Sequence, residues 1–213
     1  PAYMQVDPVD IHKILDSFND GCDLVAAWRS PRVDQFLNRL QTFFAVGHFH
    51  KPESISDTQL QDWIAELEAL PTRLRDLTAR LSETQLDTPY RPGGWTVRQV
   101  IHHLSDSHHH SYTRFKWALT EDQPVIKAYL QDGWADLFDA RTAPVSLSLD
   151  HLQAVHAKLV YLLRGLSRAE LKRAFVHPET GSVTTLEENA GRYAWHSNHH
   201  LAHISGLLER MGW

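Results

Sequence analysis

The chain has 213 residues, of which 42% are hydrophobic, and this is enough for one domain with a buried core. Its formal net charge of -5 provides no basic surface for nucleic acid, which we therefore exclude as a main partner. A single cysteine, Cys22, excludes an internal disulfide and a cysteine-rich zinc site. Neither a membrane-spanning run of about 18 apolar residues nor a signal-peptide pattern occurs, so we expect a cytoplasmic protein without a membrane partner.

The first 47 residues predict a helical extension in front of the main domain. Residues 8–20 and 31–44 both carry apolar side chains at the spacing of one helix face. Because each stretch has one apolar face that needs a partner, we expect this helical pair to pack against the main domain. That domain spans residues 48–213.

Four long stretches of the main domain repeat apolar residues every three or four positions, which predicts amphipathic helices. They span residues 58–81, 96–121, 147–166 and 187–210. Thr96 and Gln99 have the spacing of a capping box at the start of the second helix, and Asp57 is a candidate cap for the first. Pro71 lies inside the first stretch and is expected to kink or split that helix.

The connections between these helices differ in length. Residues 86–95 form a turn-rich link, whereas residues 122–146 form a long irregular crossover of the kind that often covers a site. Residues 167–175 predict a short helix, and residues 176–186 predict a hairpin. The pattern therefore predicts an all-α fold, an up-and-down four-helix bundle with an extra N-terminal helical segment.

Nine of the 15 histidines fall in two short segments, residues 102–110 and 196–203. An imidazole is a good ligand for zinc, nickel or iron(II), and histidines four positions apart on a helix lie about 6 Å apart on one face. The last helix contains two such pairs, His196 with His200 and His199 with His203. Their directions around the helix do not distinguish between the pairs. We expect the two histidine-rich helices to meet and to hold one metal ion.

The earlier helix has to supply the remaining ligand. His102 and His103 are adjacent and point about 100° apart, so at most one of them can face the ion, and periodicity leaves the choice open. Asp106 lies about one turn after His103 and is a candidate partner of a ligand or proton acceptor. Histidines outside the two segments are more often hydrogen-bonded core or surface residues than ligands, and we assign no role to them. They are His12, His48, His50, His151, His156 and His177.

Three segments of the main domain carry long and specific motifs. They are YRPGGWTVRQVIHHLSDSHHHSYTRFKWALTED at residues 90–122, FVHPETG at residues 175–181 and YAWHSNHHLAHISGLLERMGW at residues 193–213. These motifs resemble the YfiT-type branch of the DinB superfamily, and the resemblance covers about residues 48–213. Members of that branch are described as metal-dependent hydrolases, and relatives include bacillithiol S-transferases.

The resemblance implies a DinB four-helix bundle in which three histidines hold one divalent metal ion per chain. The family pattern places the ligands at His103, which is the second histidine of HHL, and at His196 and His200. His199 and His203 then become neighbours of the site. Zinc or nickel is the expected ion, and iron or manganese are further candidates.

A site with three histidine ligands leaves coordination positions open, as catalytic metal sites do. The ion could activate water in a hydrolase, or it could bind a low-molecular-weight thiol of the bacillithiol type as thiolate in an S-transferase. The sequence lacks the HExxH glutamate base, which disfavours a protease-like hydrolase, and the resemblance to thiol transferases implies that the thiol reaction is at least as well supported. In either case we expect a small-molecule substrate.

The alternative to an enzyme is a non-catalytic metal-binding or stress-response bundle, in which the ion only braces two helices. A fully ligated site without a cavity would favour that alternative, whereas an open site beside residues 122–146 would favour an enzyme. A homodimer is also considered, because related bundles often dimerise, although no feature of the sequence requires it.

Overall fold

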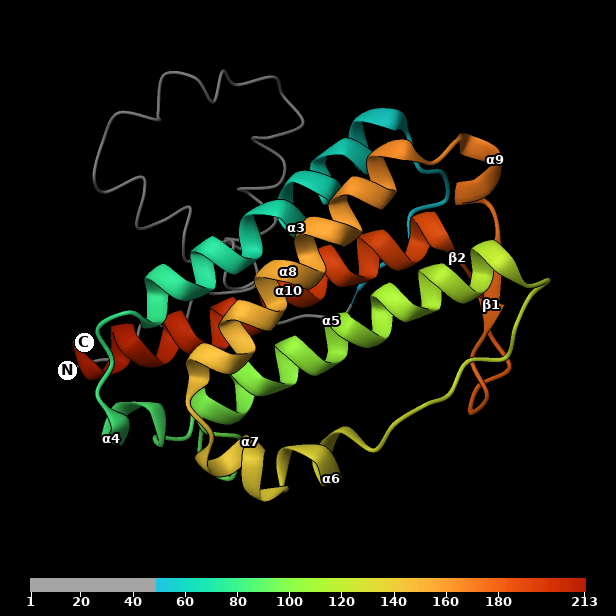
Figure 1. Cartoon of the computed structure of the whole chain (residues 1–213). Coiled ribbons are helices and arrows are strands. Elements are labelled where there is room, and N and C mark those ends of the chain that lie inside the picture. Colours follow the sequence, from blue (N-terminus) through green and yellow to red (C-terminus); the bar gives the residue numbers. More distant parts are fainter. Residues whose placement is uncertain (1–48) are drawn as a thin grey trace, which may run out of the picture. The chain divides into compact units, whose positions relative to one another are not determined.

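The computed structural model describes residues 49–213 of the chain. The predicted N-terminal helices at residues 8–20 and 31–44 lie outside the described residues. From Phe49 onward the chain forms four long helices, joined by short helices and one β-hairpin (Figure 1). The long helices are α3 (Asp57–Thr78), α5 (Val97–Thr120), α8 (Val145–Gly165) and α10 (Leu186–Met211). The predicted all-α four-helix bundle is therefore confirmed.

The shorter elements all lie in the connections between the long helices. They are α4 (Glu83–Leu86), α6 (Gln131–Ala135), α7 (Phe138–Thr142), α9 (Arg168–Leu171), β1 (Ala174–Val176) and β2 (Val183–Thr185). The two strands pair antiparallel with Ala174 opposite Thr185, which confirms the predicted hairpin. The long crossover is less irregular than expected, because it contains the short helices α6 and α7.

Side-chain caps determine where the long helices begin. The Thr96 hydroxyl accepts the backbone N–H of Gln99 and the Gln99 side chain accepts that of Thr96, so the predicted capping box of α5 is confirmed. For α3 the cap is Ser56 and not Asp57. The Ser56 hydroxyl accepts the N–H of Gln59, and Asp57 becomes the first helical residue, where its negative charge favours the helix N-terminus.

Pro71 does not split α3, which continues to Thr78. A proline inside a helix lacks the backbone N–H that would donate to the carbonyl four residues earlier, here the carbonyl of Leu67. That carbonyl instead accepts a hydrogen bond of 2.5 Å from Nδ1 of His156 on α8. Pro71 itself is buried, so tertiary packing holds the helix together across the missing backbone bond.

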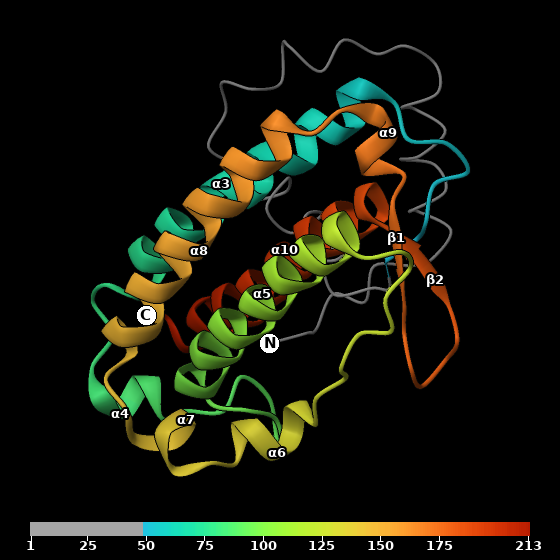
Figure 2. The same ribbon diagram turned by 45° about the vertical axis from the view of Figure 1, so that its right-hand side comes forward.

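The order of the helices interrupts the strict alternation of an up-and-down bundle at one place. α5 and α8 run in the same direction, since His102 meets Ser148 near the start of both helices and His108 meets His156 further along. The chain reaches the start of α8 by returning along the bundle through residues 121–144 (Figure 1 and Figure 2). α3 packs against α8 and α10, and α5 packs against the same two helices.

The apolar core is divided into two clusters along the bundle. On α5 one cluster ends at Leu104 and the other begins at Phe115, and on α10 the corresponding residues are Leu201 and Ala194. Buried polar side chains from α5, α8 and α10 lie between the clusters. They are Ser105, Ser107, His108, Ser111, His156, Ser197 and His200. We call these seven residues the polar layer, and it includes histidines from both of the histidine-rich segments.

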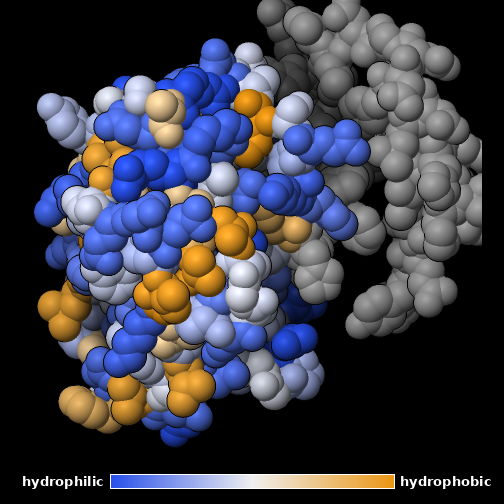
Figure 3. All heavy atoms as spheres, turned by 90° about the vertical axis from the view of Figure 1, so that its right-hand side faces the viewer, coloured by the Kyte–Doolittle hydropathy of each residue, from blue (hydrophilic) through white to orange (hydrophobic). Residues whose placement is uncertain are grey.

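The surface at the hairpin end of the bundle is mainly hydrophilic, and apolar side chains form only small groups on it (Figure 3). Val125 and Val183 are among the exposed apolar residues near the hairpin. Within residues 49–213, none of the helices combines the length and the apolar character that a membrane span requires.

Gly191 allows α10 to approach α3 closely, because a Cβ atom there would lie 2.7 Å from the ring of Trp63. We expect Gly191→Ala to lower the free energy of unfolding by about 1–3 kcal/mol through overpacking, although alanine normally favours a helix. Gly206→Ala on the same helix is the matched control, since its Cβ would meet only the flexible end of Arg210 at 3.4 Å. Urea denaturation measures both variants, and equal stability would contradict close packing at Gly191.

Candidate metal centre

Three histidine side chains from two helices bring their Nε2 atoms together at the polar layer. His103 comes from α5, and His196 and His200 lie one turn apart on α10. The Nε2 atom of His196 lies 3.2 Å from that of His103 and 3.1 Å from that of His200. The structure thus brings together the three histidines that the family resemblance implies as ligands, with all potential ligand atoms within 4.8 Å of one another.

The spacing of these nitrogens fits a shared metal ion. Zinc–nitrogen bonds of about 2.0–2.1 Å in tetrahedral geometry place two ligand nitrogens about 3.4 Å apart, close to the spacings at His196. Three neutral imidazoles that face one another also have too few protons to satisfy every Nε2 atom by hydrogen bonds. A cation would satisfy all three lone pairs at once, so both the distances and the donor set fit a divalent ion.

Burial keeps these imidazoles neutral and ready to bind. Loss of solvent, together with the smaller effect of the positive potential of His199, lowers the pKa of His103 to about 4. The same loss of solvent, together with the neighbouring imidazoles, holds the pKa of His196 and His200 well below the ordinary value for histidine. A neutral imidazole keeps the lone pair that a metal ion requires, so no proton has to be displaced near pH 7.

His102 and Trp95 take structural positions beside the site. Nδ1 of His102 lies 2.7 Å from the Ser148 hydroxyl and its Nε2 lies 3.2 Å from the Ala143 carbonyl oxygen, so this imidazole joins α5 to the start of α8. The ring of Trp95 lies 4.7 Å from that of His103 and shields one side of the site. The choice between the two adjacent histidines, which periodicity left open, is thereby explained.

His199 and His203 are neighbours of the site, as the resemblance implies. The ring of His203 stacks on that of Tyr90 with centroids 4.1 Å apart, and the centroid of the His199 ring lies 4.2 Å from that of His203. Together with His200 they form a second group with potential ligand atoms within 4.8 Å. Because Nε2 of His200 already faces His196, we take the first group as the metal centre.

His196 also has a partner at its second ring nitrogen. Nδ1 of His196 lies 3.1 Å from Nε2 of His108, and Nδ1 of His108 lies 2.8 Å from Nε2 of His156. His108 and His156 are both buried. The sequence predicted no role for His156 and none specifically for His108. No spacing along one helix could have identified them, since they meet only across the packed helices.

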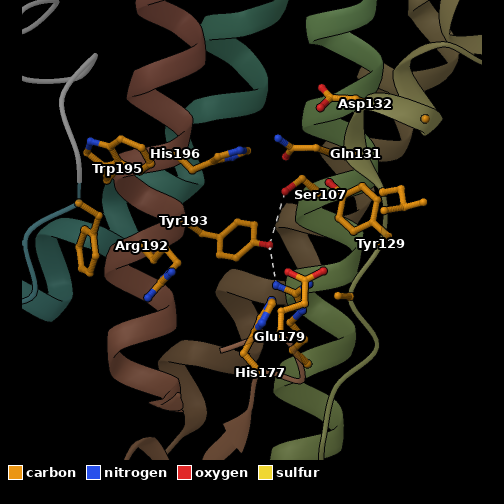
Figure 4. A pocket seen from close by; sticks show the side chains of 15 residues that line it. Ser107, Tyr129, Gln131, Asp132, His177, Glu179, Arg192, Tyr193, Trp195 and His196 are labelled. Atoms are coloured by element: carbon orange, nitrogen blue, oxygen red, sulfur yellow. Dashed lines mark hydrogen bonds between the residues drawn. The ribbon is translucent and has the colours of Figure 1, made fainter. Parts of the chain in front are cut away.

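A pocket of about 860 Å³ opens beside His196, which forms part of its wall (Figure 4). Residues 128–133 of the crossover form one side, and His177 and Glu179 of the hairpin contribute from another. The remaining wall comes from α5 and α10, apart from Phe49. The long connection therefore lines a cavity next to the three histidines, as its length predicted.

Hydrogen-bond donors are concentrated in this pocket. The Tyr193 hydroxyl accepts a bond of 3.3 Å from Nη1 of Arg114 and one of 3.5 Å from the Ser107 hydroxyl (Figure 4). Burial raises the pKa of Tyr129 to about 12, so that its hydroxyl remains protonated. These groups can donate hydrogen bonds to a carbonyl or an anionic oxygen of a bound molecule.

Asp106 does not line the pocket, although its negative charge helps to raise the pKa of Tyr129, which does. In the part of the chain that the structure describes, it belongs neither to the three-histidine group nor to the pocket wall. Burial and, to a smaller extent, the negative charge of Asp139 on α7 raise the pKa of this carboxyl to about 6, against the lowering effect of His109. Its side chain is therefore influenced by the crossover, and the structure gives no support for a role in proton transfer at the metal centre.

Asp106 should make stability depend on pH. Its pKa is raised in the folded state, so its contribution to stability is fully present below about pH 4 and is lost as the pH rises through about 6. We expect Asp106→Asn to be more stable than the parent by about 1 kcal/mol at pH 8, with a smaller difference at pH 4. Urea denaturation at both pH values measures this, with Asp62→Asn on exposed α3 surface as the control. An equal difference in stability between Asp106→Asn and the parent at pH 4 and pH 8 would contradict the raised pKa of Asp106.

Comparison with known proteins agrees with this fold. Residues 66–204 match the model of the DinB superfamily. Over 170 residues the chain is 49% identical to "Putative metal-dependent hydrolase YfiT" of Bacillus subtilis, covering 80% of this chain and 96% of that protein. A protein of Oceanobacillus iheyensis with the same kind of name is 46% identical over 170 residues, covering 80% and 98%.

A solved structure shows the same architecture. It is that of YfiT from Bacillus subtilis, described as a probable metal-dependent hydrolase with an unusual four-helix bundle topology. It matches with a TM-score of 0.78 and 48% identity, covering 81% of this chain and 99% of that one. From its motifs, its bundle and these similarities, the chain belongs to the DinB superfamily.

Proposed function

We propose that this protein is a metal-dependent enzyme that acts on a small molecule in the pocket beside His196. One observation carries this proposal: His196 belongs both to the three-histidine group and to the wall of the pocket. A pocket of about 860 Å³ has the size of small-molecule sites. Three protein ligands beside an open cavity are typical of a catalytic ion, whereas a structural ion is enclosed by four.

The side chains around the pocket would have separate roles. The metal ligands would be His103, His196 and His200. When bound, a divalent ion, with zinc or nickel preferred over iron or manganese, would lower the pKa of a water or thiol in its coordination sphere. Tyr129, Tyr193 and Arg114 would orient the substrate and donate hydrogen bonds to negative charge that develops on its oxygen atoms.

Hydrolysis is the reaction that we propose first. The similar protein YfiT from Bacillus subtilis is described as a probable metal-dependent hydrolase. Because all three ligands are neutral imidazoles, they leave the positive charge of a divalent ion undiminished, which favours ionisation of water near neutral pH. The tyrosine hydroxyls in the pocket suit the negative charge that forms on a carbonyl oxygen during such a reaction.

Transfer of a low-molecular-weight thiol, such as one of the bacillithiol type, is the second candidate. Within residues 49–213, the three-histidine group that includes His103 contains no carboxylate, and the carboxylates near it are those of Asp132 and Glu179 in the pocket wall. Hydrolysis often uses a carboxylate as general base, whereas a thiol with an ordinary pKa of about 8.5 ionises on a metal ion without one. The thiol reaction therefore needs fewer groups than hydrolysis.

A bundle in which the ion only braces two helices would explain the three histidines but not the cavity. The pocket lies against residues 128–133 of the crossover and reaches a metal ligand. This open arrangement is the one that favours an enzyme over a metal-storage or stress-response protein.

We expect the purified protein to bind about one divalent ion per chain. Because each of the three histidines would supply one ligand, His103→Ala, His196→Ala and His200→Ala should each lose most of this metal. His203→Ala, on the same helix as two of them, should keep it. Metal analysis and zinc titration measure the effect, and unchanged metal content in all three ligand variants would exclude the site.

The two reactions can be separated by paired assays of the metal-loaded protein. Bacillithiol with monochlorobimane tests thiol transfer, and a panel of esters and amides tests hydrolysis. Either activity should disappear on chelation, return with zinc or nickel and be absent from His196→Ala. Turnover in one assay alone identifies the reaction, and absence of metal-dependent turnover in both would favour a non-catalytic bundle.

A further inference from the structure

We propose that His108 and His156 are positioning residues for the metal centre. They form a line of hydrogen bonds from α3 to His196 that holds Nδ1 of His196 protonated and leaves its Nε2 free for the ion. This inference rests on the proposed metal centre, but it concerns two histidines that do not touch the ion. We call the line from Leu67 through His156 and His108 to His196 the histidine relay.

The direction of the relay follows from its outer end. The carbonyl oxygen of Leu67 can only accept a hydrogen bond, so Nδ1 of His156, at 2.5 Å, must carry the proton. Pro71 makes this acceptor available, because it lacks the backbone N–H that would otherwise bond to Leu67. The reverse order of protons would bring two lone pairs together at 2.5 Å.

The remaining protons of the relay are then determined one after another. A neutral His156 has a lone pair on Nε2, which accepts the Nδ1 proton of His108 at 2.8 Å. The lone pair of His108 therefore lies on Nε2 and accepts the Nδ1 proton of His196 at 3.1 Å. In consequence Nε2 of His196 carries a lone pair, and this is the atom that faces His103 and His200.

The surroundings of the relay favour this single arrangement. His108 and His156 have no more than 1% of their surface exposed, so water does not compete for their nitrogens. They lie between two apolar clusters, where an extra positive charge without a partner would be costly. The Leu67 carbonyl and three neutral imidazoles are joined by three hydrogen bonds with one proton in each. Every ring nitrogen of the relay has a partner in this way, apart from Nε2 of His196, which faces the metal centre.

The two proposed ligands on α10 differ in how their second nitrogens are held. Nδ1 of His196 is bonded to the relay, whereas Nδ1 of His200 is buried without a hydrogen-bond partner among the described residues. Metal-binding histidines usually donate their second N–H to a carbonyl or a carboxylate, which sets the ring orientation. In this protein the carbonyl is that of Leu67 on α3, and the imidazoles of His108 and His156 connect His196 to it by hydrogen bonds.

The protonation pattern can be measured directly by NMR of the wild-type protein labelled with 15N-histidine. Long-range 1H–15N correlations should show His108 and His156 as neutral rings protonated at Nδ1, both without metal and with one equivalent of zinc. The missing signals in His108→Phe and His156→Leu provide the assignments. Protonation at Nε2, or a charged ring, at either position would overturn the relay.

Zinc affinity, measured by competition with a chromophoric chelator, tests the positioning role. His108→Phe keeps a ring in the same space but removes both nitrogens, so we expect zinc to bind about 10–100-fold more weakly. His109→Phe is the matched control, because it breaks a histidine pair of 3.0 Å that also joins α5 to α8 but is exposed. We expect that variant to stay within about twofold of wild type.

The outcomes separate the relay from the metal centre. Equal zinc affinity of folded His108→Phe and His109→Phe would overturn the positioning role. If His108→Phe does not fold, as judged by circular dichroism, the tautomers of the wild-type protein decide. If wild-type protein binds none of zinc, nickel, iron and manganese, the proposed function fails, whereas the metal-free spectrum still confirms or excludes the proton order of the relay.

Discussion

The imidazole of His196 meets a partner at each of its two nitrogens, and the line of hydrogen bonds that continues from one of them needs all four long helices in place. α10 supplies His196, α5 supplies His103 and His108, α8 supplies His156, and α3 supplies the carbonyl of Leu67. Hydrogen bonds weaken steeply with small changes of distance and angle, so a shift of one helix would break the line. The two apolar clusters provide most of the stabilising burial, while the polar layer between them selects one relative position of the helices.

The parallel course of α5 and α8 connects this arrangement to the pocket. His108 can meet His156 in the middle of the bundle because both helices start at the same end. The chain must therefore return along the bundle from the end of α5 to the start of α8, and residues 121–144 form this returning segment (Figure 2). Part of the returning segment, residues 128–133, becomes a wall of the pocket. One feature of the topology thus provides both the contact behind the metal centre and the cavity in front of it.

Local patterns predicted the helices well, because apolar periodicity and caps such as Thr96 with Gln99 act within a few residues. The metal centre was predicted only with the help of the family motifs, since helical geometry alone could not choose between His102 and His103. His108 and His156 could not be predicted, because their roles depend on the direction of α8, which no local pattern encodes. The role of Asp106 stays a prediction: it is near His103 in sequence, but the charges that act on its carboxyl are those of Asp139 on α7 and of His109.

Pro71 is the residue at which local preference and tertiary structure disagree most. A proline in a helix interior costs about 3 kcal/mol relative to alanine, mainly through the lost backbone bond and the clash with the preceding turn. In this bundle the carbonyl released by that loss is the one that accepts the proton of His156. With another residue at position 71, the backbone N–H would donate a hydrogen bond to the Leu67 carbonyl. The buried imidazole of His156 would then have to share that acceptor with the backbone. The local defect in α3 therefore supplies the acceptor on which the proton order behind His196 depends.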